Sequence, residues 1–186
     1  MGTQILVSSL QMLSMFYLTI IILRFLLQLS RADFFNPISQ FVAKATNPVT
    51  NPIRRVVPPY GPFDGASLIF AVVFQTLMYA IILGIAGQMA PIGSLLAWGA
   101  LKVLGVLVTI YFFAIIAMIV ISWIAPGNNH PGIQLIFQIT EPVMKPFRGI
   151  LPPMGGLDLS PILAFLVLNM IRVVLSQLEM AAGMPF

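Results

Sequence analysis

Basic and acidic side chains recur in this sequence at one fixed spacing. Arg54 precedes Asp64 by ten residues, and Arg148 precedes Asp158 by the same interval. A guanidinium and a carboxylate so placed can form hydrogen-bonded ion pairs that tie one segment of chain to the next. We therefore expect Arg54, Asp64, Arg148 and Asp158 to lock two loops.

The same basic residues have a second potential use. Cations near a membrane attract anionic headgroups, each contributing about 1 kcal/mol. Four basic residues could bind a lipid headgroup or an anionic partner in this way: Arg54, Arg55, Lys145 and Arg148. Loop locking and anion capture can coexist, and both stay open at this point.

Three polar residues stand inside apolar stretches. Asn169 lies one helical turn before Arg172, and Gln75 occupies the position in the first half that matches Asn169. A charge inside a bilayer is costly and faces protein or water. We expect a polar cluster of Gln75, Asn169 and Arg172 between the two halves. The alternative is hydrogen bonding between helices, with Arg172 extending outward toward Glu179.

Other chemistry has little support in the sequence. There is no cysteine and a single histidine, His130, so thiolate sites and multi-histidine metal sites are excluded. Neither a Gly-rich phosphate loop nor a paired-carboxylate or HExxH-type motif is present. We predict no catalytic, cofactor-binding or metal-binding residues, and a protein that is not an enzyme. The net charge of +4 lies beside apolar segments, which favours anionic lipid over nucleic acid.

Long apolar segments must position these side chains. The chain is 59% hydrophobic and 8% charged, whereas soluble domains are about a quarter charged. Four blocks reach the roughly 20 residues that cross a bilayer, at about 5–29, 66–87, 95–125 and 161–178. Because the hydrocarbon offers no water to backbone groups, each block must be a helix. The sequence predicts an all-α membrane protein.

Lysine and arginine predict the orientation. They gather between the first and second blocks and between the third and fourth, while residues 88–94 contain none. Positive loops stay in the cytoplasm, so both termini are predicted to be periplasmic. Arg24 and Lys102 lie near the ends of their spans, where long side chains can reach the interface.

The sequence repeats itself at an offset of 94 residues. Between Pro37 and Asp64, eleven of 28 positions are identical to their partners in the second half. Such identity indicates duplication. We expect two parallel copies, residues 1–93 and 94–186, each with a span, a proline-rich loop and a second span.

Each loop is expected to begin with a helix. Asn36-Pro37 and His130-Pro131 are typical helix starts, and apolar residues follow at helical spacing. This helix is predicted to be cytoplasmic and either amphipathic at the interface or re-entrant. Pro48 and Pro52, with Pro142 and Pro146, each remove a donor and are expected to prevent a regular helix from continuing. Pro58-Pro59 and Pro152-Pro153 predict extended chain.

Three phrases of the sequence resemble the YggT family of bacterial integral membrane proteins, which have a duplicated two-span unit. They are Arg31-Ala-Asp-Phe-Phe-Asn-Pro-Ile38, Thr140-Glu-Pro-Val-Met-Lys-Pro-Phe-Arg148 and Pro152-Pro-Met-Gly-Gly-Leu-Asp-Leu-Ser-Pro161. The first is similar to the gammaproteobacterial branch. The first copy departs from the pattern, with Asn47 where Glu is usual and Gly65-Ala66-Ser67 in place of Leu-Ser-Pro.

The resemblance implies a bacterial inner-membrane protein linked to osmotic-stress tolerance and potassium homeostasis. Relatives in other bacteria and in plastids are linked to division, membrane organisation and cytochrome assembly. Two functions therefore remain open: a transport-associated protein, and a membrane scaffold or assembly factor that binds lipids and partners through its loops. A chain with four spans is short for a complete pathway, so a homo-oligomer or a larger complex is also expected.

Overall fold

The structure, a computed structural model, describes residues 2–125, 127–150 and 158–185. These residues form six helices, and the described segments contain no β-sheet strand. The helices are α1 (Gly2–Leu29), α2 (Pro37–Val56), α3 (Gly65–Ile85), α4 (Ile92–Ile124), α5 (Pro131–Ile150) and α6 (Ser160–Ala181). The predicted all-α class is confirmed. The predicted extended chain at Pro152-Pro153 lies outside the described residues.

Four of the helices, α1, α3, α4 and α6, are long and apolar enough to cross a membrane. They match the four predicted spans, with ends displaced by no more than three residues. The third of them, α4, contains 33 residues in one unbroken helix. At 1.5 Å per residue it measures about 50 Å, longer than the roughly 30 Å hydrocarbon core, so it must tilt or extend beyond it.

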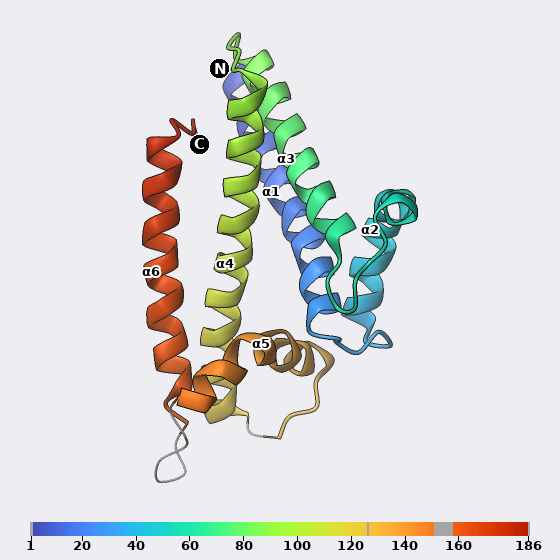
Figure 1. Ribbon diagram of the computed structural model, residues 1–186, viewed down its shortest axis with the longest axis vertical. Coiled ribbons are helices and arrows are strands. Elements are labelled where there is room, and N and C mark those ends of the chain that lie inside the picture. Colours follow the sequence, from blue (N-terminus) through green and yellow to red (C-terminus); the bar gives the residue numbers. More distant parts are fainter. Residues whose placement is uncertain (1, 126, 151–157, 186) are drawn as a thin grey trace.

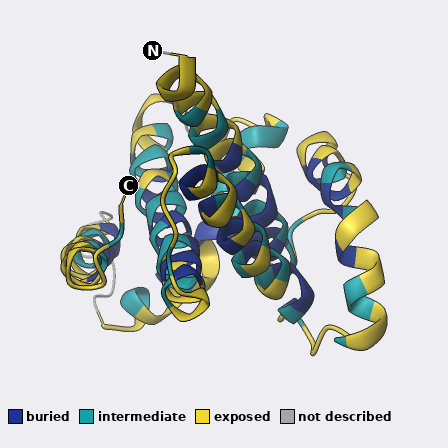
Figure 2. Ribbon diagram, turned by 90° about the horizontal axis from the view of Figure 1, so that it is seen from above, coloured by how far each residue is buried: buried dark blue, intermediate teal, exposed yellow. Residues whose placement is uncertain are grey.

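The long helices run side by side, with both chain ends near one end of the molecule and α5 at the other (Figure 1). α4 packs against α3, α6 and α5, whereas α6 contacts only α4 and α5 among the described elements. Seen from above, buried residues lie on the facing sides of the central helices, while α6 is mostly exposed (Figure 2). The core is centred on α1, where Leu18, Ile21, Ile22 and Leu26 are fully buried.

One glycine allows α3 and α4 to approach closely. A Cβ atom added to Gly99 would lie 2.5 Å from Thr76 Oγ1 and 3.1 Å from the carbonyl oxygen of Val72. Small residues at such crossings let two helix backbones approach within a membrane. The α3–α4 contact therefore depends on the missing side chain of Gly99.

The helix of each loop is longer than predicted. α2 continues through Pro48 and Pro52, and α5 continues through Pro142 and Pro146. The expectation that these prolines prevent a continuing helix was wrong, because the helices bend instead of ending (Figure 1).

Hydroxyl groups accompany the bend in α2. Thr46 donates to the carbonyl of Val42 at 2.7 Å, a bond that favours bending. Tyr17 of α1 donates at 3.1 Å to the carbonyl of Ala45, one turn before Pro48. Pro48 has no N–H group to donate to the carbonyl of Lys44, and the hydroxyl of Tyr17 adds a side-chain donor at the neighbouring carbonyl of Ala45. Thr140 of α5 likewise donates to Ile136, at 2.8 Å.

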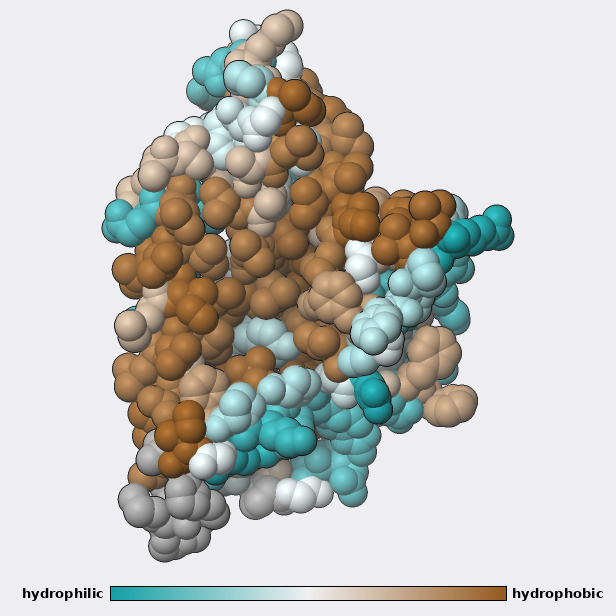
Figure 3. Space-filling model, in the orientation of Figure 1, coloured by the Kyte–Doolittle hydropathy of each residue, from teal (hydrophilic) through white to brown (hydrophobic). Residues whose placement is uncertain are grey.

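The surface divides along the length of the molecule. Hydrophobic residues cover the long helices, and hydrophilic residues gather around α2 and α5 (Figure 3). The region of α2 also exposes large apolar side chains, including Phe35, Ile38, Phe41 and Val56. A helix that exposes both kinds of residue suits the boundary between headgroups and acyl chains.

Candidate functional site

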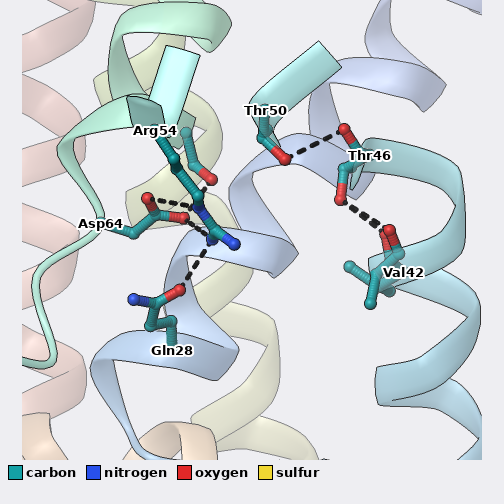
Figure 4. Close-up of polar contacts among 8 residues, drawn as sticks. Gln28, Val42, Thr46, Thr50, Arg54 and Asp64 are labelled. Carbon is teal, nitrogen blue, oxygen red and sulfur yellow. Dashed lines mark hydrogen bonds and ion pairs between the residues drawn. The ribbon is translucent and has the colours of Figure 1, made fainter. Parts of the chain in front are cut away.

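An ion pair joins the end of α2 to the start of α3. The guanidinium of Arg54 contacts both carboxylate oxygens of Asp64, and its Nη2 atom also donates to Gln28 Oε1 at 2.8 Å (Figure 4). The side chain of Asp64 is 0% exposed and that of Arg54 is 19% exposed. Because Gln28 belongs to α1, this site connects three helices of the first half. The ten-residue spacing thus places the two charges in contact.

The electrostatics of Asp64 follow from its partners. Burial acts to raise the pKa of the Asp64 carboxyl, but hydrogen bonds from Arg54 and Ser67 and the charge of Arg54 outweigh it. The net result is a pKa below the ordinary value of 3.8. Asp64 is therefore a carboxylate at neutral pH, and its negative charge is compensated within the protein.

The second pair has the same spacing but a more open environment. Arg148 Nε lies 3.3 Å from Asp158, and Nη1 lies 2.7 Å from Glu141. The side chains of Arg148 and Asp158 are each 38% exposed. Burial acts to lower the pKa of Arg148, but the two carboxylates raise it. At the matching position of the first half Asn47 replaces Glu141, and its buried Oδ1 atom has no hydrogen-bond partner among the described residues.

The four basic residues expected to contact lipid or a partner fall into two groups. Arg54 and Arg148 are occupied by carboxylates and are partly buried. Arg55 and Lys145 are exposed and pair with no acidic group in the described chain. Arg54 and Arg148 thus position the loops, while Arg55 and Lys145 present charge to the surroundings.

The two bent helices begin with matching caps. Asn36 Oδ1 accepts from the backbone of Ile38 at 3.0 Å, and His130 Nδ1 accepts from the backbone of Gly132 at 3.2 Å. Both are local bonds to an N–H group that has no partner within the helix. The amide nitrogen of Asn36 also donates to the carbonyl of Pro131 at 2.8 Å. The starts of α2 and α5 therefore contact each other.

The predicted polar cluster does not assemble. Gln75 lies on α3, where its Oε1 accepts from Ser14 of α1 at 3.1 Å. Arg172 lies on α6, with its guanidinium 4.4 Å from the ring centre of Phe112, and Asn169 is exposed on the same helix. Among the described elements α3 and α6 do not contact each other, because α4 lies between them. Helical spacing alone could not indicate this separation.

Gln75 and Arg172 of the predicted cluster instead line two separate cavities. One, of about 230 Å³, is lined by Gln75, Ser14 and Lys102 among others. A second, of about 240 Å³, is lined by Lys102, Arg172 and Glu179 among others. Lys102 and Met15 line both cavities, so these two residues stand between Gln75 and Arg172. The sequence predicted that Lys102 reaches the membrane interface, whereas the structure places it between the long helices. The one signal for this position was that Lys102 is the single charged residue in its apolar span.

Sequence reasoning also missed the role of Gln28. This residue is the third member of the Arg54–Asp64 site, but it occurs in the last turn of an apolar span and has no repeat partner of the same type. No group of three His, Asp or Glu side chains that could bind a metal occurs in the part of the chain that the structure describes.

The chain is similar in sequence to one protein family and to several bacterial proteins. A model of the CCB3/YggT family matches residues 3–86 and again residues 97–178. The uncharacterized protein PA0392 of Pseudomonas aeruginosa is 47% identical over 179 residues, 95% of this chain and 91% of that protein. The uncharacterized protein YggT of Escherichia coli is 34% identical over 176 residues, 90% of this chain and 87% of its own length.

A more distant relative comes from a plant. The chloroplastic YlmG homolog protein 2 of Arabidopsis thaliana is 43% identical over 60 residues, 32% of this chain and 24% of that protein. No solved structure matches the chain significantly.

Proposed function

The chain belongs to the CCB3/YggT family, and from that premise we propose that it is a membrane scaffold or assembly factor without enzymatic activity. In this proposal α2 and α5 lie at the cytoplasmic face of the bacterial inner membrane and contact anionic lipids and protein partners. The observation that supports it most is the repeated Arg–Asp pair, which holds a bent, partly apolar helix to the start of a span in each half. A surface held in this way is pre-organised for binding.

Duplication is part of the proposal. The two family matches begin at residues 3 and 97, the same 94-residue offset at which the sequence repeats. Each half has the order long helix, bent helix, long helix. We infer two parallel copies with both termini in the periplasm.

A direct potassium pathway has less support. The polar cavities between the long helices are lined by the cations Lys102 and Arg172, with Glu179 as the acidic residue of the second cavity. Fixed positive charges raise the energy of a second cation in a low-dielectric environment. We propose that any role in osmotic tolerance or potassium homeostasis is indirect, through lipids or through a larger complex.

Surface charge provides the test of the scaffold role. Arg55→Gln combined with Lys145→Gln removes two exposed cations that belong to no described ion pair. We expect cells that carry this double variant to lose growth at high osmolarity and to lose co-purifying partners, at unchanged protein abundance. Lys102→Gln serves as the matched control, because its charge lies between the long helices. Normal growth and normal partners in the double variant would refute the scaffold role.

Transport is tested with purified protein in liposomes. We expect potassium flux no greater than that of empty vesicles. Flux above that level which Arg172→Gln or Lys102→Gln alters would replace the scaffold proposal with a direct transport role.

The absence of cysteine allows a direct test of orientation. Single variants Gln88→Cys, between α3 and α4, and Asn51→Cys, on α2, place one thiol at each exposed site. We expect a membrane-impermeant maleimide to label Gln88→Cys in cells with a permeabilised outer membrane and to label Asn51→Cys only after lysis. The opposite pattern would invert the proposed topology.

A further inference from the structure

Two polar atoms, one on α1 and one near the start of α2, are buried without partners among the described residues. Arg24 Nε of α1 and Ser39 Oγ of α2 have no hydrogen-bond partner there, and Ser39 is only 3% exposed. A buried donor that stays unpaired is costly, so such atoms are normally satisfied by water, an ion or a ligand. This pair marks a place where the fold alone does not satisfy its own polar groups.

Both residues line one cavity. It has a volume of about 480 Å³ and lies between the end of α1, the start of α2 and the turn at Gly61 and Pro62. Arg31 and Gln28 line it as well, and none of the described residues that line it is acidic. Arg24 is close enough to Asp64 and Arg54 to feel both charges, but Asp64 already pairs with Arg54. The described part of the cavity wall therefore offers no carboxylate to the positive charges of Arg24 and Arg31.

The backbone at Arg31 supports a role beyond folding. Arg31 has φ of 50°, the one positive value among the described residues other than glycine. It follows the last turn of α1, where the backbone of Ala32 donates to Leu27 at 2.9 Å. This is the position at which helices commonly use glycine, since a side chain is disfavoured there. An arginine held in this conformation beside a basic cavity points to a use for its side chain.

An apolar cavity adjoins the basic one. It has a volume of about 460 Å³ and is lined by His130 and by apolar residues of α1, α2 and α5, such as Leu23, Val42 and Ile139. Leu27 lines both cavities. Cationic and hydroxyl donors beside an apolar cavity match the two chemical parts of a phospholipid, a phosphate and an acyl chain.

We propose that the cavity bounded by Arg24, Arg31 and Ser39 is a specific binding site for a phosphate group, supplied by an anionic phospholipid whose acyl chain occupies the adjoining apolar cavity. The lipid as the source rests on the proposed placement of α2 at the membrane interface. The phosphate site itself rests only on the residues that line it.

The second half of the chain provides an internal comparison. At the 94-residue offset, Arg24 corresponds to Met118 and Gln28 to Ser122, and both of these line a cavity beside α5 and α6. Ser39 corresponds to Ile133. The same architecture therefore forms with an apolar residue at the position of Arg24, so the basic cavity is not a requirement of folding.

That comparison supplies variants that are expected to fold. Arg24→Met introduces the residue found at the matching position, and Arg31→Gly places glycine where φ is already positive. Lys44→Gln is the matched control, since it removes an exposed cation of α2 from the same half, and Lys44 neither lines the cavity nor belongs to the basic residues assigned to lipid contact.

The experiment measures binding to the purified full chain in a neutral detergent. The ligands are dihexanoyl phosphatidylglycerol, inorganic phosphate and dihexanoylglycerol, which lacks phosphate. We expect a saturable rise in the unfolding temperature with the phospholipid, a weaker rise with phosphate and none with dihexanoylglycerol. Native mass spectrometry should show one bound phospholipid. Arg24→Met and Arg31→Gly should each weaken binding about tenfold, with Lys44→Gln unchanged.

Each outcome decides the proposal. Equal affinity for phosphate and phospholipid would retain the phosphate site and overturn the lipid as its source. Unchanged binding in folded Arg24→Met and Arg31→Gly would overturn the site. That failure would be distinguishable from failure of the scaffold role, which depends on Arg55 and Lys145 and is read from growth and partners.

Discussion

The side-chain amide of Asn36 donates a 2.8 Å hydrogen bond to the carbonyl of Pro131, so the starts of α2 and α5 meet. A second hydrogen bond joins the same two regions: the backbone N–H of Asp33, just before α2, donates to Gln138 Oε1 of α5 at 3.0 Å. α5 lies at the end of the molecule opposite the chain ends, and the start of α2 is held to it there (Figure 1).

Substitutions at Asn36 separate its two tasks. Asn36→Asp keeps an oxygen to cap α2 but loses the donor to Pro131, whereas Asn36→Ala loses both. We expect Asn36→Ala to lower the free energy of unfolding by about 2 kcal/mol and Asn36→Asp by about 1 kcal/mol. Denaturant unfolding in detergent measures both. Equal losses would show that the cap on α2 contributes nothing, and an unchanged Asn36→Asp would show that the bond to Pro131 contributes nothing.

The two ion pairs should differ in strength because they differ in burial. In Asp64→Asn the positive charge of Arg54 loses its buried partner, so we expect a loss of about 2–3 kcal/mol, reduced by the partial exposure of Arg54. Asp158→Asn leaves Arg148 exposed to solvent and paired with Glu141, and should cost less than about 1 kcal/mol. The reverse order, measured in the same unfolding experiment, would contradict the assignment of Asp64 to the buried pair.

The contribution of Asp64 should depend on pH in a defined direction. Its pKa in the folded protein lies below 3.8, so the unfolded chain takes up the proton first as the pH falls. The stability difference between the native chain and Asp64→Asn should be the same at pH 7 and pH 5, and should shrink as the pH falls below 3.8. Thermal unfolding across this range checks it, and a difference that grows with acidification would contradict the pairing.

Close packing of α3 on α4 should make Gly99 intolerant of a methyl group. Gly99→Ala would bring a Cβ atom to 2.5 Å from Thr76 Oγ1, so the helices must separate, and we expect a loss of about 2 kcal/mol. Gly84→Ala is the control, because nothing lies within 4 Å of its added Cβ. Similar stability of the two variants would show that α3 and α4 are not packed as described.

Much of the fold could be predicted because its signals are local. A continuous apolar run is sufficient to indicate a span, and the bounds of α3 and α6 differ from the predicted ones by at most three residues. The ten-residue spacing of Arg54 and Asp64 likewise indicated their contact. The behaviour of Pro48 was not predicted, because the hydroxyl of Tyr17 that donates near its bend comes from another helix.

The sequence by itself determined that this is an all-helical membrane protein with four apolar spans. Hydropathy is a local property of the chain, and an apolar run inside a membrane must form a helix because no water is available to its backbone groups. Only the tertiary structure decided which face of each span meets which neighbour. Gln75 bonds to Ser14 and is kept from Arg172 by α4, and Arg24 and Ser39 line one cavity although fifteen residues separate them. Helix rotation depends on packing between helices, such as the close approach at Gly99, and no periodicity within a single span specifies it.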